Sequence, residues 1–488
     1  MDFRFSSKQA FLFTFINYLG VLIGVFSTLF IYPKDTEMLG IVRYIDGYAQ
    51  IFYPIMVLGA STALLNFYPL LNTILQRKLF TYSILSVFLM IIFTGIGVVI
   101  LGYSDVFERF RYVIIAFFIA ICLAFVDLIK RQLTNMQKIA VPTLYEKIIP
   151  KVALPLAFIL VLYFSYSLDG ALLFYTLTFV CMLLLVVIYL LQYYRPVYTL
   201  QFKDLFQIIS KKNYYQYSLY AFTASIGSFF AFRVDSFMIP EITGDFELNG
   251  IFNIGVTLAN AIMIPAIGVF ALYSPAISNN IKNGEFDLLK KKYSEVAKNL
   301  FFVGILLYGC VILGIHDLFK ILPAYDNLVQ SLPIIYILGA SVLLNMSTGF
   351  NTEIIAFSSY YRFNLVSIIV LMFLNVGLNW YILKYTGYGI IGVAFASFFS
   401  MAIFNIMKLY FIYKKFKMIP FSTSYLKVVL ISVTLLTVLY YIPSLSSPLF
   451  TMLLKCSLYV ILLLTVLYIT RLIIPLNDFV KKITNNRD

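Results

Sequence analysis

Apolar segments of about 20 residues recur along the whole chain and are separated by short loops rich in lysine and arginine. Crossing the hydrocarbon of a bilayer as a helix takes about 20 apolar residues. Hydrophobic residues make up 61% of the 488 residues and charged residues 12%, whereas soluble domains are nearer to about half apolar and a quarter charged. We therefore predict an all-α polytopic membrane protein, because each backbone amide in lipid needs a partner within its own segment.

The sequence predicts fourteen transmembrane helices. The N-terminal stretch MDFRFSSKQAFLF opens an apolar run that is too long for a signal-peptide core and has no A-x-A cleavage pattern, so we interpret it as part of a retained first span. The predicted spans lie approximately at 9–32, 47–70, 80–103, 111–129, 148–166, 170–193, 215–239, 250–273, 298–320, 331–354, 362–384, 388–412, 425–443 and 450–473.

The distribution of basic residues supports this count, because cytoplasmic loops carry an excess of lysine and arginine. With the N-terminus inside, most of the 36 basic residues fall in inner loops. We therefore predict that both termini are cytoplasmic and attribute the net charge of +14 to this topology, with the charge facing anionic lipid. The predicted outer loops hold few basic residues, namely Lys34, Arg43, Arg109, Arg111, Lys320 and Lys384.

Two long inner loops contain short amphipathic patterns. These are FKDLFQIISKK at 202–212 and FDLLKKKYSEVAK at 286–298. Aromatic residues and leucines fall on one face and lysines on the other, so both segments are predicted to lie along the membrane surface.

The chain shows an internal repeat between the second and the eighth predicted span. Each begins near a glycine at its outer end, carries a proline in its middle and has a second proline at its inner end. Such duplication is typical of alternating-access transporters, whose two halves move about a site near the membrane midplane. The matching pairs are Gly40 and Gly250, Pro54 and Pro265, and Pro69 and Pro275.

This repeat predicts two six-helix lobes related by a pseudo-two-fold axis, followed by two further helices. The predicted N-lobe is 1–194, and a cytoplasmic linker with an amphipathic helix occupies 195–214. The predicted C-lobe is 215–415, and 416–488 holds helices 13 and 14 and a short cytoplasmic tail.

Three stretches resemble the polysaccharide and O-antigen flippases. RVDSFMIPEITGDFELNGIFNIGVTLANAI (233–262) is similar to that family's passage from span 7 to span 8. EMLGIVRYIDGYAQIFYPIMVLGASTALLNFYP (37–69) is similar to its passage from the first to the second helix. NTEIIAFSSYYRFNLVSIIVLMFLNVGLNWYILKYTGYGIIGVAFAS (351–397) is similar to its tenth-to-twelfth helix region. This family is the oligosaccharide-lipid branch of the multidrug/oligosaccharidyl-lipid/polysaccharide (MOP) exporter superfamily.

The resemblance implies a fold of fourteen helices in two lobes around a central cavity. It also implies a function: moving an undecaprenyl-diphosphate-linked oligosaccharide, such as an O-antigen or capsule repeat unit, across the bacterial inner membrane by alternating access. A monomer in contact with membrane lipids and with polysaccharide polymerase machinery is the expected setting. No cofactor is expected beyond coupling to H⁺ or Na⁺.

Charged residues inside spans are costly, and they usually face a bundle interior or a water-filled cavity. The apolar run FFAFRVDSFMIPE (229–241) contains Arg233 and Asp235. We expect Arg233 to face the cavity and bind the diphosphate or an acidic sugar, since a guanidinium can contact phosphate through two donors. Arg43, at the outer end of the second span, would assist from the other lobe. The alternative is that Arg233 reaches the outer interface or pairs with an acidic neighbour.

Four acidic residues are candidates for coupling transport to an ion gradient, and each also has a structural alternative as one half of an ion pair. They are Asp235, Asp46, Glu353 and Asp127. Lys455, near the outer end of the last span, is a candidate for touching a headgroup in a lipid groove. The alternative is that it extends to the interface.

Other kinds of function have less support. A multidrug or metabolite exporter of the same superfamily is the alternative function, and such exporters typically have twelve helices and carboxylates within the membrane. The outer loops are too short for a membrane glycosyltransferase or polymerase, so no enzyme is predicted. No phosphate-binding loop or nucleic-acid module is present, and the four cysteines and His316 lack metal-ligand spacing.

Overall fold

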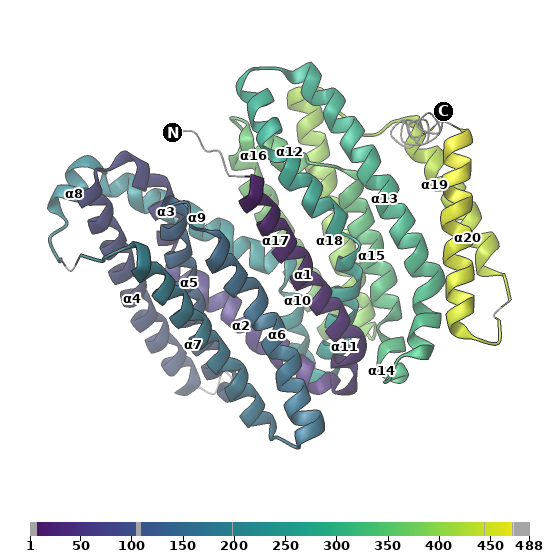
Figure 1. Ribbon diagram of the computed structural model, residues 1–488, viewed down its shortest axis with the longest axis horizontal. Coiled ribbons are helices and arrows are strands. Elements are labelled where there is room, and N and C mark those ends of the chain that lie inside the picture. The colour runs from purple at the N-terminus through teal and green to yellow at the C-terminus, as the bar shows by residue number, and fades with distance from the viewer. Residues whose placement is uncertain (1–6, 104–108, 198, 444, 471, 473–488) are drawn as a thin grey trace. The chain divides into compact units, whose positions relative to one another are not determined.

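The computed structural model describes residues 7–103, 109–197, 199–443, 445–470 and 472 (Figure 1), with side chains described except for residues 7–17, 103 and 271. Within these ranges the regular structure is α-helical with short 3₁₀ turns and no strand, which confirms the all-α prediction. The predicted cytoplasmic placing of the two termini concerns residues 1–6 and 473–488, which lie outside the described residues.

The described chain divides into two compact units. Unit 1 contains residues 7–27 and 35–253, and its central helix is α5, which packs against α2 and α7 and is more buried than the other uninterrupted spans. The helices of unit 1 are α1 (Ser7–Phe30, whose last residues belong to unit 2), α2 (Thr36–Val57), α3 (Ala60–Phe67), α4 (Thr73–Tyr103), α5 (Phe110–Asn135), α6 (Ala140–Phe164), α7 (Leu168–Tyr193), α8 (Lys203–Ile208), α9 (Lys211–Phe232) and α10 (Asp235–Thr243).

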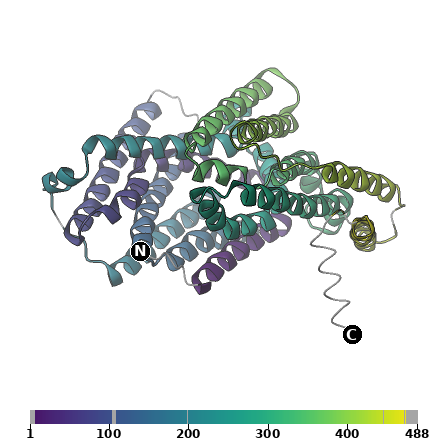
Figure 2. The ribbon, with the colours of Figure 1, turned by 90° about the horizontal axis from the view of Figure 1, so that it is seen from above.

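Unit 2 contains residues 28–34 and the chain from 254 onward. Its central helix α13 packs against α15 and α20, and α15 packs against α18. These helices lie side by side in Figure 1, and Figure 2 shows α19 and α20 beside α13 from a second direction. The helices are α11 (Phe246–Ala261, which begins in unit 1), α12 (Ile264–Lys282), α13 (Phe286–Ile321), α14 (Tyr325–Gln330), α15 (Leu332–Ser347), α16 (Asn351–Phe357), α17 (Arg362–Tyr385), α18 (Gly389–Phe416), α19 (Thr423–Tyr440) and α20 (Pro448–Ile469).

Three of the predicted spans are helix pairs bent at a short break. The pairs α2 with α3, α11 with α12, and α15 with α16 bend by 47°, 51° and 49°. The first two are the spans matched by the internal repeat. Pro54 lies four residues before the break at Leu58, and Pro265 lies just after the break at Ile262 and Met263. A proline removes one backbone donor and crowds the preceding turn, which is where helices kink.

The described residues contain nine helices long and apolar enough to cross a membrane, or up to twelve if each bent pair is one span. The chain is therefore a multi-pass membrane protein. Two predicted spans stay outside this count. The first, 9–32, has side chains that are only partly described, and 215–239 is divided between α9 and the short α10. The count of fourteen remains a prediction.

Helices α9 and α10 pack against α2 in the structure, and α9 also packs against α3, so contact density places residues 211–253 in unit 1. The predicted lobes divide the chain by its sequence repeat instead, and their boundary at the 195–214 linker remains a prediction. Within that linker, α8 is tied to α4 by an ion pair of 2.8 Å between Lys78 Nζ and Asp204 Oδ2. The Lys78 ammonium holds the pKa of Asp204 below its ordinary value.

The prediction for 286–298 was wrong. This segment is not a separate surface helix, because it forms the first third of the continuous helix α13. Leu289, Tyr293 and Val296 are buried in the core of unit 2 together with Phe350 and Ile354. The apolar face that was assigned to lipid therefore packs against protein.

Gly309 on α13 is expected to be essential for the packing of α20. A Cβ at this position would lie 2.3 Å from the ring of Tyr459, whose hydroxyl donates to the carbonyl of Ile305 at 3.1 Å and so fixes the ring. We expect Gly309→Ala to lower the free energy of unfolding by about 1–3 kcal/mol, as overpacking does. Thermal unfolding in detergent measures this. Gly377→Ala on α17, where a Cβ meets nothing within 4 Å, is the matched control and should be neutral or stabilising.

Candidate substrate-binding site

Helix α2 carries the first two charged residues of the site. Asp35 caps its N-terminus by accepting a hydrogen bond from the amide of Met38 at 2.9 Å, so the helix begins at Thr36, eleven residues before the predicted span. Arg43 and Asp46 therefore lie within the first half of the helix, and the position of Arg43 at the outer end of the span remains a prediction. The Nη1 atom of Arg43 lies 3.3 Å from Oδ2 of Asp46, one turn further along.

Tyr175 on α7 is the second partner of Asp46. Its hydroxyl donates to Oδ1 at 3.2 Å, and the tyrosine is buried. Asp46 thus accepts one hydrogen bond from its own helix and one from another. Sequence reasoning missed Tyr175, because 129 residues separate the two partners.

Arg233 lies at the end of α9, where the predicted span 215–239 is interrupted. It is the C-terminal cap, with φ −140°, and α10 starts at Asp235. The prediction of one continuous helix was wrong, since α9 ends at Phe232 and a separate helix, α10, packs against α2 with Asp235, Met238 and Ile239 buried. The predicted residues Arg233 and Asp235 belong to different helices.

Arg233 is exposed, although it lies next to other charged residues of unit 1. Arg233 lies within electrostatic reach of Arg43, Asp46 and Tyr53. The structure therefore brings together the two arginines that the sequence analysis singled out.

Lys151 on α6 is a further cation of this cluster that sequence reasoning missed. Its charge acts on Arg43, Arg233 and Lys147, and it packs against Gly20 of α1, where a Cβ would lie 3.1 Å from its Nζ atom. The signal was present in the sequence, since Lys151 falls inside the predicted span 148–166 rather than in the loop before it.

The cluster formed by Arg43, Asp46, Lys151 and Arg233 is called the cationic cluster below. It holds three cations and one carboxylate, so its net charge is positive. Two guanidinium groups and an ammonium at such a place favour an anion with several oxygens, because guanidinium groups match phosphate and carboxylate geometry.

The other predicted acidic residues have separate surroundings. Asp127 lies 3.5 Å from Arg131 Nε on α5, and Asp235 is buried in the first turn of α10. Glu353 on α16 lies near Lys408, a fully buried lysine of α18 whose Nζ donates to Thr352 at 2.8 Å. Among the described residues, no three His, Cys, Asp or Glu side chains gather as a metal site would require. The coupling roles remain predictions.

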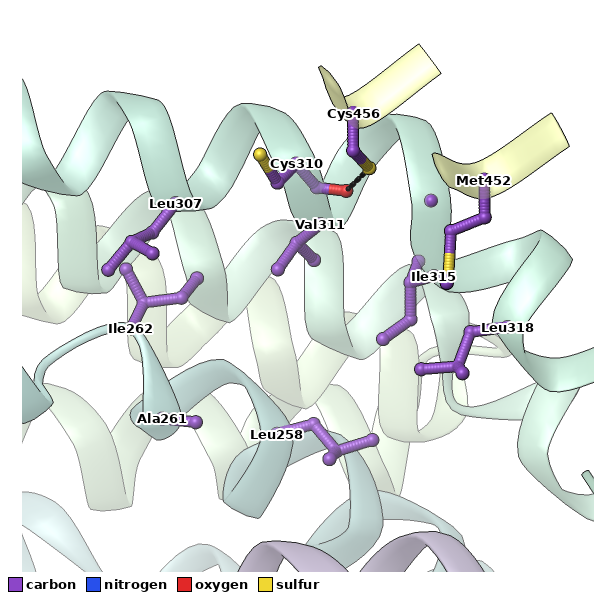
Figure 3. Close-up of a pocket in the computed structure, with 11 residues that line it drawn as sticks. Leu258, Ala261, Ile262, Leu307, Cys310, Val311, Ile315, Leu318, Met452 and Cys456 are labelled. Atoms are coloured by element: carbon purple, nitrogen blue, oxygen red, sulfur yellow. Dashed lines mark hydrogen bonds between the residues drawn. The ribbon is translucent and has the colours of Figure 1, made fainter. Parts of the chain in front are cut away.

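Unit 2 contains an apolar groove of about 290 Å³ between α11, α13 and α20 (Figure 3). Cys456 Sγ donates to the carbonyl oxygen of Cys310 at 3.5 Å across this groove. Lys455 is half-buried on α20 beside Cys456 and is not part of the lining, so its headgroup role remains a prediction. The lining consists of Leu258, Ala261, Ile262, Leu307, Cys310, Val311, Gly314, Ile315, Leu318, Met452 and Cys456.

Comparison with solved structures shows that the chain is similar in fold to MOP-superfamily transporters. One similar structure is the lipid II flippase MurJ in an inward closed conformation, with 15% identity, a TM-score of 0.67, and coverage of 94% of this chain and 99% of that one. A multidrug-resistance MATE transporter in an inward-facing conformation matches with 13% identity, a TM-score of 0.64, and coverage of 84% of this chain and 98% of that one.

A MOP transporter from Pyrococcus furiosus is a third match, with 11% identity, a TM-score of 0.55, and coverage of 84% of this chain and 96% of that one. No protein-family profile and no curated protein match the sequence. At these identities the comparisons show the fold alone. They fit the superfamily that the sequence resemblance implied, whereas the O-antigen branch of it remains a proposal.

Proposed function

We propose that this protein is a flippase that moves an undecaprenyl-diphosphate-linked oligosaccharide, such as an O-antigen or capsule repeat unit, across the bacterial inner membrane by alternating access. The observation that carries the proposal is the cationic cluster, which lies on α2, on α6 and at the end of α9 in unit 1. A diphosphate needs several fixed cations to replace its hydration inside a membrane protein, and Arg43, Lys151 and Arg233 supply them.

Each member of the cluster has a role in this proposal. The guanidinium groups of Arg43 and Arg233 bind phosphate oxygens, and Lys151 adds a third positive charge. Asp46 orients Arg43 through their 3.3 Å contact and is itself held by Tyr175. When the substrate leaves, Asp46 remains to balance part of the charge. The cluster then does not have to stay as three uncompensated cations.

The multidrug-exporter alternative is favoured by one observation, the similarity of the fold to multidrug-resistance transporters. Lipophilic cations are common substrates for a site dominated by carboxylates. The cationic cluster has the opposite sign and would repel them. The lipid-linked diphosphate is therefore the better match.

Reconstituted liposomes test the proposed function. The full-length protein is incorporated with undecaprenyl-diphosphate-oligosaccharide, and the fraction accessible to an external glycan-modifying enzyme is followed over time. We expect the protein to accelerate equilibration between leaflets over protein-free liposomes, and not to transport the lipophilic cation ethidium. Ethidium transport without lipid movement would overturn the proposal. Imposed H⁺ or Na⁺ gradients in the same liposomes test coupling, with Asp46→Asn and Glu353→Gln as variants.

The polyprenyl chain of this substrate is proposed to lie in the groove between α11, α13 and α20, whose lining is almost entirely apolar. Val311→Trp would fill much of the groove. We expect it to slow transport of the undecaprenyl substrate about tenfold, while a short-chain diphosphate-linked analogue moves at the wild-type rate. Ile321→Trp, on the same helix but outside the groove, is the control. Equal slowing of long and short substrates by Val311→Trp would contradict this placement.

A further inference from the structure

A small polar pocket lies where α2 ends and α3 begins. Leu58 and Gly59 at the break have φ values of 44° and 75°, and a Cβ on Gly59 would lie 2.0 Å from the carbonyl oxygen of Ser218, so the chain turns tightly against α9. The pocket has a volume of about 130 Å³, and polar atoms contribute most of its surface. It is lined by Tyr53, Pro54, Val57, Gly59, Ser61, Thr62, Asp127, Arg131, Ala221, Phe222 and Ser225.

Polar groups around this pocket have unused hydrogen-bonding capacity. Ser61 is only 3% exposed, lines the pocket, and forms no side-chain hydrogen bond to any residue that the structure describes. The Nε atom of Arg131 is buried without a hydrogen-bond partner in the same described part of the chain. It lies 3.5 Å from Asp127 Oδ1, which is beyond ordinary hydrogen-bond distance. Buried groups of this kind normally have partners, so the pocket offers donors and acceptors to a molecule that enters it.

The two charged residues that line the pocket have opposite signs. Asp127 and Arg131 are one carboxylate and one guanidinium, and Lys130 and Glu146 next to them form their own ion pair at 2.6 Å. The pocket therefore differs from the cationic cluster and does not select a phosphate. It offers a carboxylate as acceptor, a guanidinium as donor and hydroxyls that can do either. A ligand that matches needs closely spaced groups that both donate and accept.

We propose that this pocket binds the hydroxyl groups of a neutral sugar residue. Sugar hydroxyls donate and accept at once, and Tyr53 and Phe222 in the lining supply aromatic surface for the apolar side of a sugar ring. This inference rests on the proposed function and adds a separate subsite for the glycan, eight or so residues along the helices from the cationic cluster.

The spacing of the two subsites is the same on two helices. On α2, Asp46 of the cationic cluster lies eight residues before Pro54 of the pocket, and on α9, Ser225 of the pocket lies eight residues before Arg233. At about 1.5 Å per residue, each interval corresponds to roughly 12 Å. One lipid-linked glycan can therefore place its diphosphate in the cationic cluster and a sugar in the pocket.

Binding of two lipids to the full-length protein in nanodiscs tests the inference. The probes are undecaprenyl diphosphate and undecaprenyl-diphosphate-linked N-acetylglucosamine. We expect the wild type to bind the glycosylated lipid about tenfold more tightly, and Ser61→Ala and Arg131→Gln each to remove most of this increment without weakening binding of undecaprenyl diphosphate. Arg233→Gln should weaken both lipids equally. If both pocket variants keep the full increment, the sugar subsite is wrong.

A second measurement separates failure of this inference from failure of the proposed function. Ser225→Cys places a thiol in the pocket, and its rate of reaction with a water-soluble maleimide is followed in the presence of N-acetylglucosamine, glucose, glucuronate or inorganic phosphate. Protection by a neutral sugar, lost with Arg131→Gln, would support the subsite even if no lipid were flipped. Protection by phosphate alone, or by none of the four, would overturn it.

Discussion

Replacing Arg233 with glutamine is expected to weaken binding of undecaprenyl diphosphate by about 10- to 100-fold. A hydrogen bond to a charged group is worth about 1.5–3 kcal/mol, and the substitution removes both the charge and the paired donors of the guanidinium. Because Arg233 keeps accessible surface at the end of α9, the protein should fold normally without it. Arg233→Lys keeps the charge but not the two-donor geometry, so its binding affinity should lie between those of the wild type and Arg233→Gln.

Binding and transport in liposomes measure this prediction, and detergent-stable yield measures folding. Arg362→Gln, at an exposed position in the first turn of α17, is the control and should match the wild type. Raising the ionic strength should weaken binding of undecaprenyl diphosphate to the wild type more than to the Arg233→Gln variant, because salt screens the charge that the variant lacks. Full transport by Arg233→Gln at normal yield would exclude the diphosphate role.

Replacing Gly40 with alanine is expected to have the second large effect, on structure rather than on charge. A Cβ at this position of α2 would lie 1.8 Å from the carbonyl oxygen of Phe246, and one on Gly250 would lie 1.9 Å from the carbonyl oxygen of Thr36. These are backbone atoms that no rotamer change can move. The first turns of α2 and α11 would have to separate, which also breaks the 2.9 Å hydrogen bond from Asn249 Nδ2 to the Gly40 carbonyl.

We expect Gly40→Ala to lower the free energy of unfolding by about 3 kcal/mol, the upper end of the usual range for overpacking. When Gly40→Ala is combined with Asn249→Cys, the new thiol should react with maleimide several-fold faster than it does with Gly40 in place. Gly47→Ala is the control on the same helix, since its Cβ would make an ordinary contact of 3.4 Å with Phe237. Unfolding temperature and labelling rate are both measured. An unchanged labelling rate in Gly40→Ala would contradict this prediction, because α2 and α11 would then accommodate the added methyl group without separating.

Span positions were predictable from the sequence because hydrocarbon fixes the length of an apolar helix. The predicted 170–193 became α7 at 168–193, and 362–384 became α17 at 362–385. The bends were not predictable at this level. Pro54 precedes its break by four residues, whereas Pro265 follows its own, so the same residue type marks two different places relative to a kink.

The candidate site was predictable in part. Arg43 and Arg233 stood out because a charge inside an apolar segment is costly, and the structure places them within electrostatic reach of each other. The partners of those charges were not predictable. Tyr175 comes from a helix far along the chain, and the position of Lys151 inside its predicted span does not indicate which charges it meets. Pairing between distant helices depends on packing, which a single sequence does not state.

Helix α13 runs for 36 residues without a break, or about 54 Å, whereas the hydrocarbon is about 30 Å thick. Its N-terminal third carries the lysine run Lys290–Lys292, and its later turns line the apolar groove with Leu307, Val311 and Leu318. An unbroken helix behaves as a stiff lever. A displacement of the end that carries the lysine run is therefore transmitted to the groove wall, because the helix has no break between these two parts.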